Sequence, residues 1–172
     1  MMGLSTLAQD EAIYLKLVRV VNLAARPFNQ RIGLEHGLRL NEWRVMAILA
    51  RSPGCAASRV AEQTGMDKMS ISRALAGLQE TGRALRIDDP DDQRRSRHFL
   101  TDDGLTLYKL VWIRAREREA ELFAGVDAEE LARLSATLDK LVAAMSRADS
   151  GAAVSVAPEA FTASAPVPLS TG

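Results

Sequence analysis

A chain of 172 residues is long enough for one well-packed domain with an added helical layer, and it is too short for two independent enzymatic domains. Lys plus Arg and Asp plus Glu both number 22, so net charge gives no overall attraction to nucleic acid or to an anionic membrane. Apolar residues make up 47% and aromatic residues only 5%, and the abundance of Ala and Leu favours a mostly helical fold.

The sequence has no pattern typical of a membrane span or a secretion signal. Its longest unbroken apolar run, Val45 to Ala50, is bounded by Arg44 and Arg51, and no basic segment followed by an apolar one stands at the N-terminus. We therefore expect a cytoplasmic protein with no membrane partner. Cys55 is the single cysteine, so no intrachain disulfide can form, and no metal site is predicted.

The first predicted element is a long amphipathic helix. From about Asp10 to Phe28, apolar residues recur at helical spacing, and Pro27 should kink or end this helix. Gly33 and Gly37 mark the loop that we expect to follow.

Three shorter helices are predicted next. Asn41 is a suitable N-cap for a buried helix that ends at the turn 52–54. A short helix then ends at Gly65, and another begins after Asp67 as its N-cap. The last of these helices places three apolar residues on one face, namely Ile71, Leu75 and Leu78. Two short helices joined by a three-residue turn are typical of a helix-turn-helix.

A β-hairpin is predicted directly after these helices. Two strand-like stretches, residues 84–87 and 96–100, flank a polar segment that suits a hairpin tip. A helix-turn-helix followed by a hairpin is the arrangement in which the second helix enters the DNA major groove. The expected fold is therefore mainly α with a small β-wing, a winged helix-turn-helix over about residues 38–104.

Two further helices complete the predicted fold. After Thr101 as N-cap, apolar residues follow in near-heptad spacing to Leu122, and a second such stripe runs from Leu131 to Met145. Asp127 and Glu130 resemble the ends of a capping box before the second stripe. Residues 149–172 change to Ala, Ser, Val and Pro without periodicity, so we expect a disordered tail.

Local charge indicates where DNA would be contacted. When the apolar face of the helix after Asp67 is buried, Lys68, Ser70 and Arg73 point outward near its N-terminal half. In the wing, four acidic residues precede three arginines, and we expect Asp92 to orient Arg94 and to leave one arginine for the minor groove. The predicted DNA contacts are Lys68, Ser70, Ser72, Arg73, Arg94, Arg95 and Arg97.

Three segments of this sequence resemble the MarR family of bacterial transcriptional regulators over about residues 7–145. They are Trp43-Arg44-Val45-Met46, then Gly65-Met66-Asp67-Lys68-Met69-Ser70-Ile71-Ser72-Arg73, and then Asp92-Gln93-Arg94 continuing to Leu100-Thr101-Asp102-Asp103-Gly104. Two positions depart from the family pattern. His98 stands where an apolar strand residue is usual, and Ala56 replaces the common hydroxyl cap.

The resemblance implies a homodimer and a regulatory function. By this resemblance, residues 1–148 form one domain, in which residues 7–36 and 105–147 are dimerisation helices around the winged-helix lobe. It also implies a ligand-responsive repressor that binds a palindromic operator in double-stranded DNA, with half-sites about 10 base pairs apart. The expected effector is a small anionic aromatic molecule, with Arg19, His36 and Trp43 as candidate pocket residues and no cofactor.

Alternatives remain open at this stage. An enzyme would need a nucleophile with a base, paired carboxylates or metal ligands, and two histidines with one cysteine do not supply them. A winged-helix module that has lost DNA binding is the stronger competitor, because charges from Arg59 to Thr101 nearly cancel. This segment has eight basic and seven acidic residues. The basic residues are Arg59, Lys68, Arg73, Arg83, Arg86, Arg94, Arg95 and Arg97, and the acidic residues are Glu62, Asp67, Glu80, Asp88, Asp89, Asp91 and Asp92. Cys55 is interpreted as a semi-buried structural residue, with peroxide sensing as the alternative.

Overall fold

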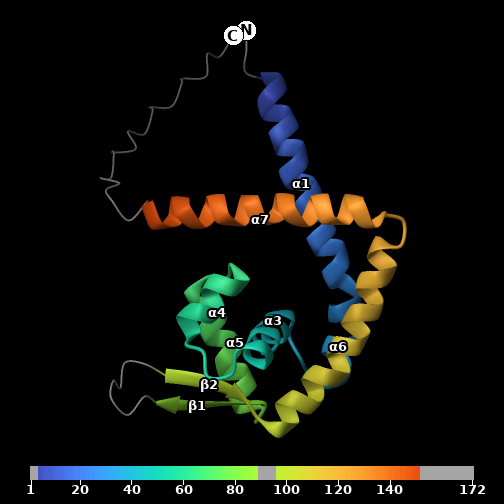
Figure 1. Cartoon of the computed structure of the whole chain (residues 1–172). Helices are drawn as coiled ribbons and strands as arrows, with labels where there is room; N and C mark the ends of the chain where they lie inside the picture. The colour runs from blue at the N-terminus through green and yellow to red at the C-terminus, as the bar shows by residue number, and fades with distance from the viewer. Residues whose placement is uncertain (1–3, 89–95, 152–172) are drawn as a thin grey trace, which may run out of the picture. The chain divides into compact units, whose positions relative to one another are not determined.

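Helices make up most of the described residues, and a β-hairpin follows the helix Lys68–Glu80 (Figure 1). The computed structural model describes residues 4–88 and 96–151, and the chain divides into two units after Phe123. The first unit contains α1 (Leu4–Pro27), the π-helix η1 (Phe28–Ile32), α2 (Gly33–His36), α3 (Leu40–Arg51), α4 (Ala57–Thr64), α5 (Lys68–Glu80), β1 (Ala84–Asp88), β2 (Ser96–Leu100) and α6 (Asp102–Phe123). The second contains α7 (Ala128–Gly151). Within the described ranges, no helix is long and apolar enough to cross a membrane.

The segment after the first helix is more helical than the sequence predicts. α1 ends at Pro27, as predicted, since proline lacks the N–H that would continue the α-helical hydrogen bonds. The chain then continues as η1, in which the N–H of Gly33 donates to the carbonyl of Phe28 five residues earlier. The predicted loop at Gly33 is therefore wrong, because Gly33 starts α2, and only Gly37 adopts a left-handed turn, with φ of 53°.

The N-cap of α3 is also different from the prediction. The helix begins at Leu40 after Arg39, and Asn41 lies inside its first turn. Glu42 is the reason, because its Oε2 accepts a 2.7 Å hydrogen bond from the backbone N–H of Arg39 and so closes the helix start from the third position. The Asn41 side chain instead accepts a hydrogen bond from Arg44.

The caps predicted around the helix-turn-helix are confirmed. α4 ends at Gly65, which has φ of 66° and donates its N–H to the carbonyl of Ala61. α5 starts after Asp67, whose Oδ1 accepts from the N–H of Ser70 at 2.8 Å. The hydroxyl of Thr101 accepts from the N–H of Gly104 and caps α6.

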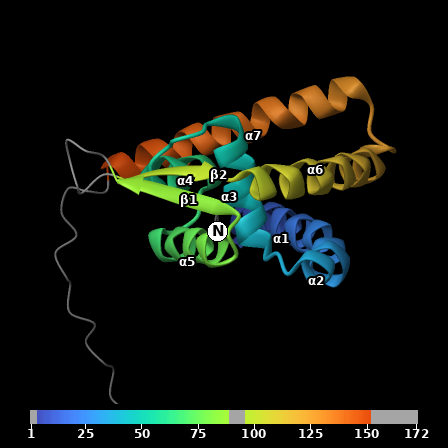
Figure 2. The ribbon, with the colours of Figure 1, turned by 90° about the horizontal axis from the view of Figure 1, so that it is seen from below.

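The core of the first unit forms around α3, which packs against α4, α5, α6 and β2 (Figure 2). The apolar face predicted for α5 is buried and meets α3. Fully or nearly fully buried apolar residues are Leu38, Val45, Met46, Ile48, Leu49, Val60, Ile71, Ala74, Leu75, Leu78, Ala84 and Val111. This packing fixes which side of α5 is exposed, because the buried residues lie on a single stripe.

The two wing strands form the antiparallel pair that the sequence predicts, in a register from Ala84 opposite Leu100 to Asp88 opposite Ser96. The loop before α4 adds a bridge on the other side of β2, where Cys55 pairs with His98. His98 is in the interior, where only 4% of it is exposed, so a polar residue occupies a buried position at which the family pattern has an apolar one. The predicted hairpin tip falls on residues 89–95, outside the described residues.

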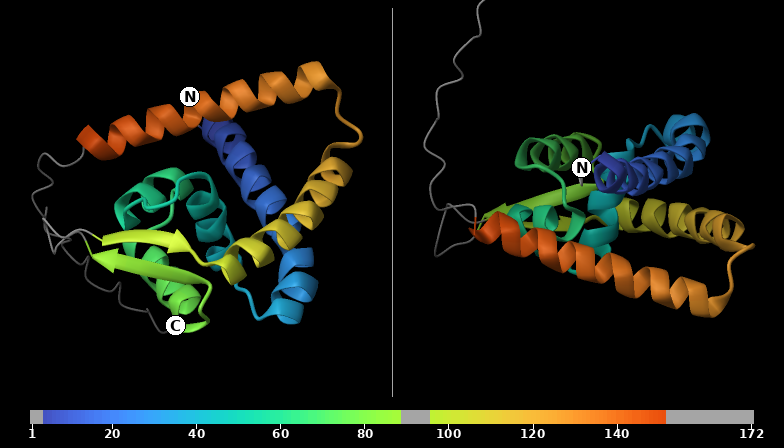
Figure 3. Two further views of the ribbon diagram at one scale, coloured as in Figure 1. Left: turned by 60° about the horizontal axis from the view of Figure 1, so that its bottom comes forward. Right: turned by 90° about the horizontal axis from the view of Figure 1, so that it is seen from above.

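The helix after the wing leads back toward the N-terminal segment. α6 runs out of the hairpin and passes the C-terminal end of α1 (Figure 3). α7, in the second unit, is capped at its start by Asp127, whose Oδ1 accepts from the N–H of Glu130 at 2.8 Å. It continues to Gly151, two residues beyond the predicted start of the tail at 149. The rest of the predicted tail, residues 152–172, lies outside the described residues.

Candidate nucleic-acid interface and effector cavity

The exposed side of α5 carries the side chains that the sequence predicts for DNA contact. Lys68, Ser72 and Arg73 are exposed and Ser70 is half-buried. Met69 lies among them with 65% of its surface exposed, although it is apolar. Met69 is not among the DNA contacts predicted from the sequence. Its position opposite the buried stripe of α5 was the available signal, since residues two before and two after a buried helical residue face outward.

Ser70 already forms hydrogen bonds with the N-cap residue of α5. Asp67 accepts both the N–H of Ser70 at 2.8 Å and the Ser70 hydroxyl at 2.6 Å. The side-chain hydrogen bond from Ser70, followed by its backbone hydrogen bond, holds the pKa of Asp67 below its usual value. Asp67 is thus a cap, as predicted, and the Ser70 oxygen is left as an acceptor because its proton is donated to Asp67.

The wing is described only at its base. Arg97 is exposed on β2, opposite Ile87, on the side of the hairpin away from buried His98. Arg86 and Asp88 form an ion pair of 2.8 Å at the end of β1. The predicted contacts Arg94 and Arg95, and the predicted pair of Asp92 with Arg94, lie outside the described residues.

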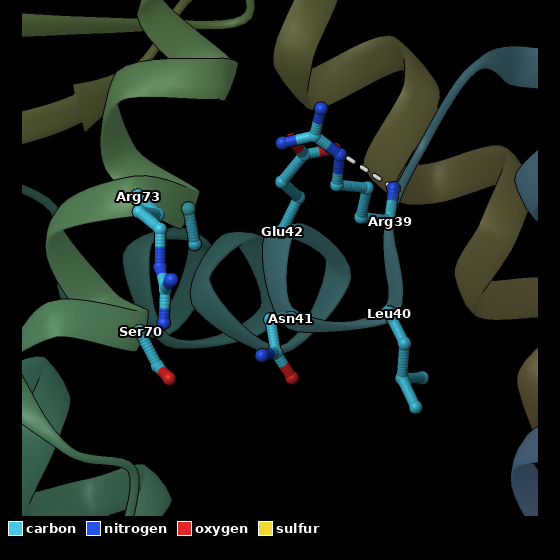
Figure 4. A pocket seen from close by; sticks show the side chains of 7 residues that line it. Arg39, Leu40, Asn41, Glu42, Ser70 and Arg73 are labelled. Atoms are coloured by element: carbon cyan, nitrogen blue, oxygen red, sulfur yellow. Dashed lines mark hydrogen bonds and ion pairs between the residues drawn. The ribbon is translucent and has the colours of Figure 1, made fainter.

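A groove of about 310 Å³ lies between the first turn of α3 and the middle of α5 (Figure 4). Its lining residues are Arg39, Leu40, Asn41, Glu42, Ser70, Arg73 and Ala74. Two of the predicted DNA contacts, Ser70 and Arg73, therefore share a surface with the start of α3. The sequence analysis did not assign any residue of α3 except Trp43 to a site.

A larger cavity of about 400 Å³ lies where the end of α1, η1, α3 and α6 meet. Aliphatic and aromatic side chains form one part of its wall, and three arginines and three glutamates form the rest. The charged lining residues are Arg31, Arg114, Glu117, Arg118, Glu119 and Glu121, and the apolar ones are Ala24, Ala25, Pro27, Phe28, Ile32, Leu40, Trp43, Ala115 and Leu122. Trp43 stacks on Tyr108 with ring centroids 5.4 Å apart.

The three predicted effector residues are not gathered in that cavity. Trp43 lines it, whereas Arg19 and His36 do not. Arg19 is exposed on α1. His36 is half-buried at the end of α2, where its Nε2 is 3.7 Å from Oε1 of Glu35. The cavity's arginines come instead from η1 and α6, and only the packing of these elements brings them together.

Cys55 is half-buried, as predicted, in the loop that pairs with β2. Burial raises the pKa of its thiol, and this effect outweighs the lowering by its backbone hydrogen bond and by Arg59. A raised pKa leaves less of the reactive thiolate at neutral pH, which favours the structural interpretation over peroxide sensing.

Comparison with known proteins identifies this arrangement. A sequence model of the MarR family matches residues 36–95, which includes α3, α4, α5 and β1. The winged-helix lobe of this chain is thus similar to that of MarR-family regulators. The homoprotocatechuate degradative operon repressor of Escherichia coli is 28% identical over 120 residues, which cover 70% of this chain and 81% of that repressor.

Solved structures of MarR regulators share the fold. A MarR-family transcriptional regulator from Silicibacter pomeroyi has a TM-score of 0.70 and 27% identity, and the match covers 82% of this chain and 94% of that one. BpsR of Bordetella bronchiseptica, whose DNA binding is regulated by 6-hydroxynicotinic acid, has a TM-score of 0.68 at 22% identity, with coverage of 76% and 98%. The family model and these relatives support a DNA-binding transcriptional regulator and not an enzyme.

Proposed function

We propose that this protein is a ligand-responsive repressor of the MarR family that binds a palindromic operator as a homodimer. The outward face of α5 carries the proposal, because a basic and polar surface with Met69 at its centre faces away from a fully buried stripe. Lys68 and Arg73 would contact phosphates or guanine, Ser70 and Ser72 would bond to polar groups, and Met69 would contact a thymine methyl. Arg94, Arg95 and Arg97 would add wing contacts.

Exposed apolar side chains support the homodimer. α1 presents Ile13, Leu17, Val20, Val21 and others to solvent in the single chain, and α6 and α7 present similar sets. A soluble monomer rarely exposes so many large apolar residues on its helices, so we assign residues 7–36 and 105–147 to dimerisation within a domain of residues 1–148. The proposed symmetry pairs two copies of α5 with the two halves of a palindrome.

The cavity beside Trp43 is the proposed effector site. It combines an aromatic wall with the guanidinium groups of Arg31, Arg114 and Arg118 and with three glutamates, and Arg114 and Arg118 pair with Glu35 and Glu121. A small aromatic molecule that carries a carboxylate would stack on this wall and compete with the glutamates for the arginines. Its similarity to a repressor of an aromatic-degradation operon, and to a regulator controlled by 6-hydroxynicotinic acid, points to the same class of effector.

One experiment tests the central claim. Fluorescence anisotropy with DNA from upstream of the protein's own gene should show saturable binding, two chains per DNA, and a protected palindrome in a footprint. Arg73→Ala should lower the affinity about tenfold or more, while Arg51→Ala, at an exposed position at the end of α3, should bind like the wild type. Equal binding of scrambled and native DNA would contradict sequence-specific recognition.

A further inference from the structure

The groove in Figure 4 gathers hydrogen-bond donors from two helices at the edge of the exposed face of α5. Arg39, at the start of α3, has 80% of its side chain exposed. Arg73 comes from α5, one turn along from Met69, and its guanidinium group lies beside Ser70 in Figure 4. Two guanidinium groups and one carboxylate, that of Glu42, give the groove a net charge of one positive unit.

The carboxylate of Glu42 does not compete for these donors from the open side of the groove. Only 5% of Glu42 is exposed, and its Oε2 already accepts the backbone N–H of Arg39 at 2.7 Å. Its other oxygen, Oε1, lies 3.7 Å from Nη1 of Arg39 and faces Gly77 of α5, where a Cβ would collide with it. Gly77 thus allows α3 and α5 to approach closely, so the two walls of the groove are held in place before any ligand binds.

Asn41 supplies a further donor, and its orientation is fixed. Nη1 of Arg44 donates to Oδ1 of Asn41 at 3.2 Å, so the amide oxygen is occupied and the Nδ2 group remains for a ligand. Figure 4 shows Nδ2 on the side toward α5. The Ser70 hydroxyl gives its proton to Asp67, so the donors of the groove are Arg39, Asn41 and Arg73.

We propose that this groove binds a phosphate of the DNA backbone, so that the start of α3 is a second DNA-contacting element beside α5. A set of donors with a net positive charge, whose one carboxylate is buried, suits an anion. With Met69 directed at the floor of the major groove, Arg73 and the α3 wall face the strand at its rim, where a phosphate contact fixes the register of the helix. The inference rests on the proposed function and extends it to Arg39 and Asn41.

The first test compares charge and salt dependence. Full-length wild type, Arg39→Ala, Arg39→Lys and Asn41→Asp are titrated by anisotropy against the footprinted fragment over a series of KCl concentrations. Loss of one phosphate contact should reduce the slope of log affinity against log salt by about 0.9 per chain, and Arg39→Ala should bind about five- to tenfold more weakly. Arg39→Lys should retain most of the slope.

Asn41→Asp is the sharpest variant, because it keeps the shape and the bond from Arg44 but replaces the Nδ2 donor with a negative oxygen. It should weaken binding more than Arg39→Ala does. Arg51→Ala is the matched control, since Arg51 is an exposed arginine at the opposite end of α3. Thermal melts report whether each variant folds. The substitution Arg39→Ala leaves the backbone N–H that Glu42 caps in place, so the fold should persist.

The second test locates the phosphate. Single phosphates of the operator are replaced by neutral methylphosphonates, and the wild type should lose affinity at one position in each half-site. At that position Arg39→Ala should lose clearly less than the wild type does, because the Arg39 part of the contact is already absent. Unchanged affinity and slope for Arg39→Ala, or equal methylphosphonate effects in both proteins, would overturn the inference while leaving operator binding intact.

A third measurement separates DNA phosphate from a free anion. The side-chain amide signals of Asn41 in an NMR spectrum should shift with operator DNA and stay unchanged with millimolar inorganic phosphate. A shift with inorganic phosphate that DNA does not displace would identify a site for a free anion and overturn the proposal. If the wild type binds no upstream fragment in any salt, the proposed function fails first and this inference fails with it.

Discussion

Arg83 donates from Nη2 to the carbonyl oxygen of His36 at 2.5 Å and from Nη1 to the carbonyl of Gly37 at 3.1 Å. Arg83 lies in the turn between α5 and β1, and the two carbonyls stand at the C-terminal end of α2, where helix carbonyls lack partners. A single side chain therefore joins the segment that follows α1 to the lobe that carries α5. Glu35 of the same segment is paired with Arg114 of α6 at 3.0 Å.

Replacement of Arg83 by Ala should lower the free energy of unfolding by about 1–2 kcal/mol, because two charge-assisted hydrogen bonds are lost at a partly exposed site. Urea denaturation measures this change. Arg59→Ala, which removes an exposed ion pair with Glu62 within α4, should cost less than about 0.5 kcal/mol. Equal losses for the two variants would show that the Arg83 contacts add no stability.

Gly104→Ala should destabilise the fold, although alanine usually favours a helix. A Cβ at Gly104 would collide with the backbone carbonyl oxygen of Arg83, which cannot move like a flexible side chain. We expect a loss of about 1–3 kcal/mol and a lower midpoint in a thermal melt. Gly125→Ala is the control, since a Cβ there meets nothing within 4 Å. A stabilised Gly104→Ala variant would mean that α6 can shift away from Arg83.

Acidification should destabilise the protein through His98. Burial, with a smaller contribution from Arg86, holds the pKa of His98 below its ordinary value of 6.5. The unfolded chain therefore takes up a proton first as pH falls, and the folded state loses stability from about pH 6.5 down to the lowered pKa, by up to about 1.4 kcal/mol per pH unit.

The His98→Leu variant checks that assignment, because leucine restores an apolar strand residue and cannot take up a proton. Urea midpoints between pH 7.5 and pH 5 should fall less steeply for this variant than for the wild type. His36 and the carboxylates are present in both proteins, so they cancel in the comparison. Parallel pH curves would assign the acid sensitivity to groups other than His98.

Ligand binding in the cavity beside Trp43 should be visible in its fluorescence. The chain has two tryptophans, so Trp112→Phe leaves Trp43 as the only one. Titration of that variant with homoprotocatechuate or 6-hydroxynicotinic acid should change the emission in a saturable way, since Trp43 lines the cavity. The same ligands should also release DNA from the wild type. In Trp43→Phe, the remaining Trp112 should respond much less, and equal responses would place the ligand elsewhere.

Local chemistry by itself determined the helix-turn-helix and the hairpin. The caps at Asp67, Thr101 and Asp127 act on groups three residues away, and Gly65 ends α4 through its own backbone, so the sequence predicts them correctly. The prediction that Asn41 caps α3 was wrong for a related reason. Two residues of suitable chemistry compete at the start of α3, and the carboxylate of Glu42 caps the helix from within.

Only the tertiary structure shows the groove between α3 and α5, the cavity beside Trp43, and the contacts of Arg83 with the end of α2. Arg83 and Gly37 are 46 residues apart, and Glu35 and Arg114 are 79 apart, so their contacts depend on how the buried faces of α3, α5 and α6 pack. The same packing buries His98 and brings Arg39 and Asn41 beside Arg73. Helical periodicity shows which side of each element is apolar, but only the packed core sets which polar sides become neighbours.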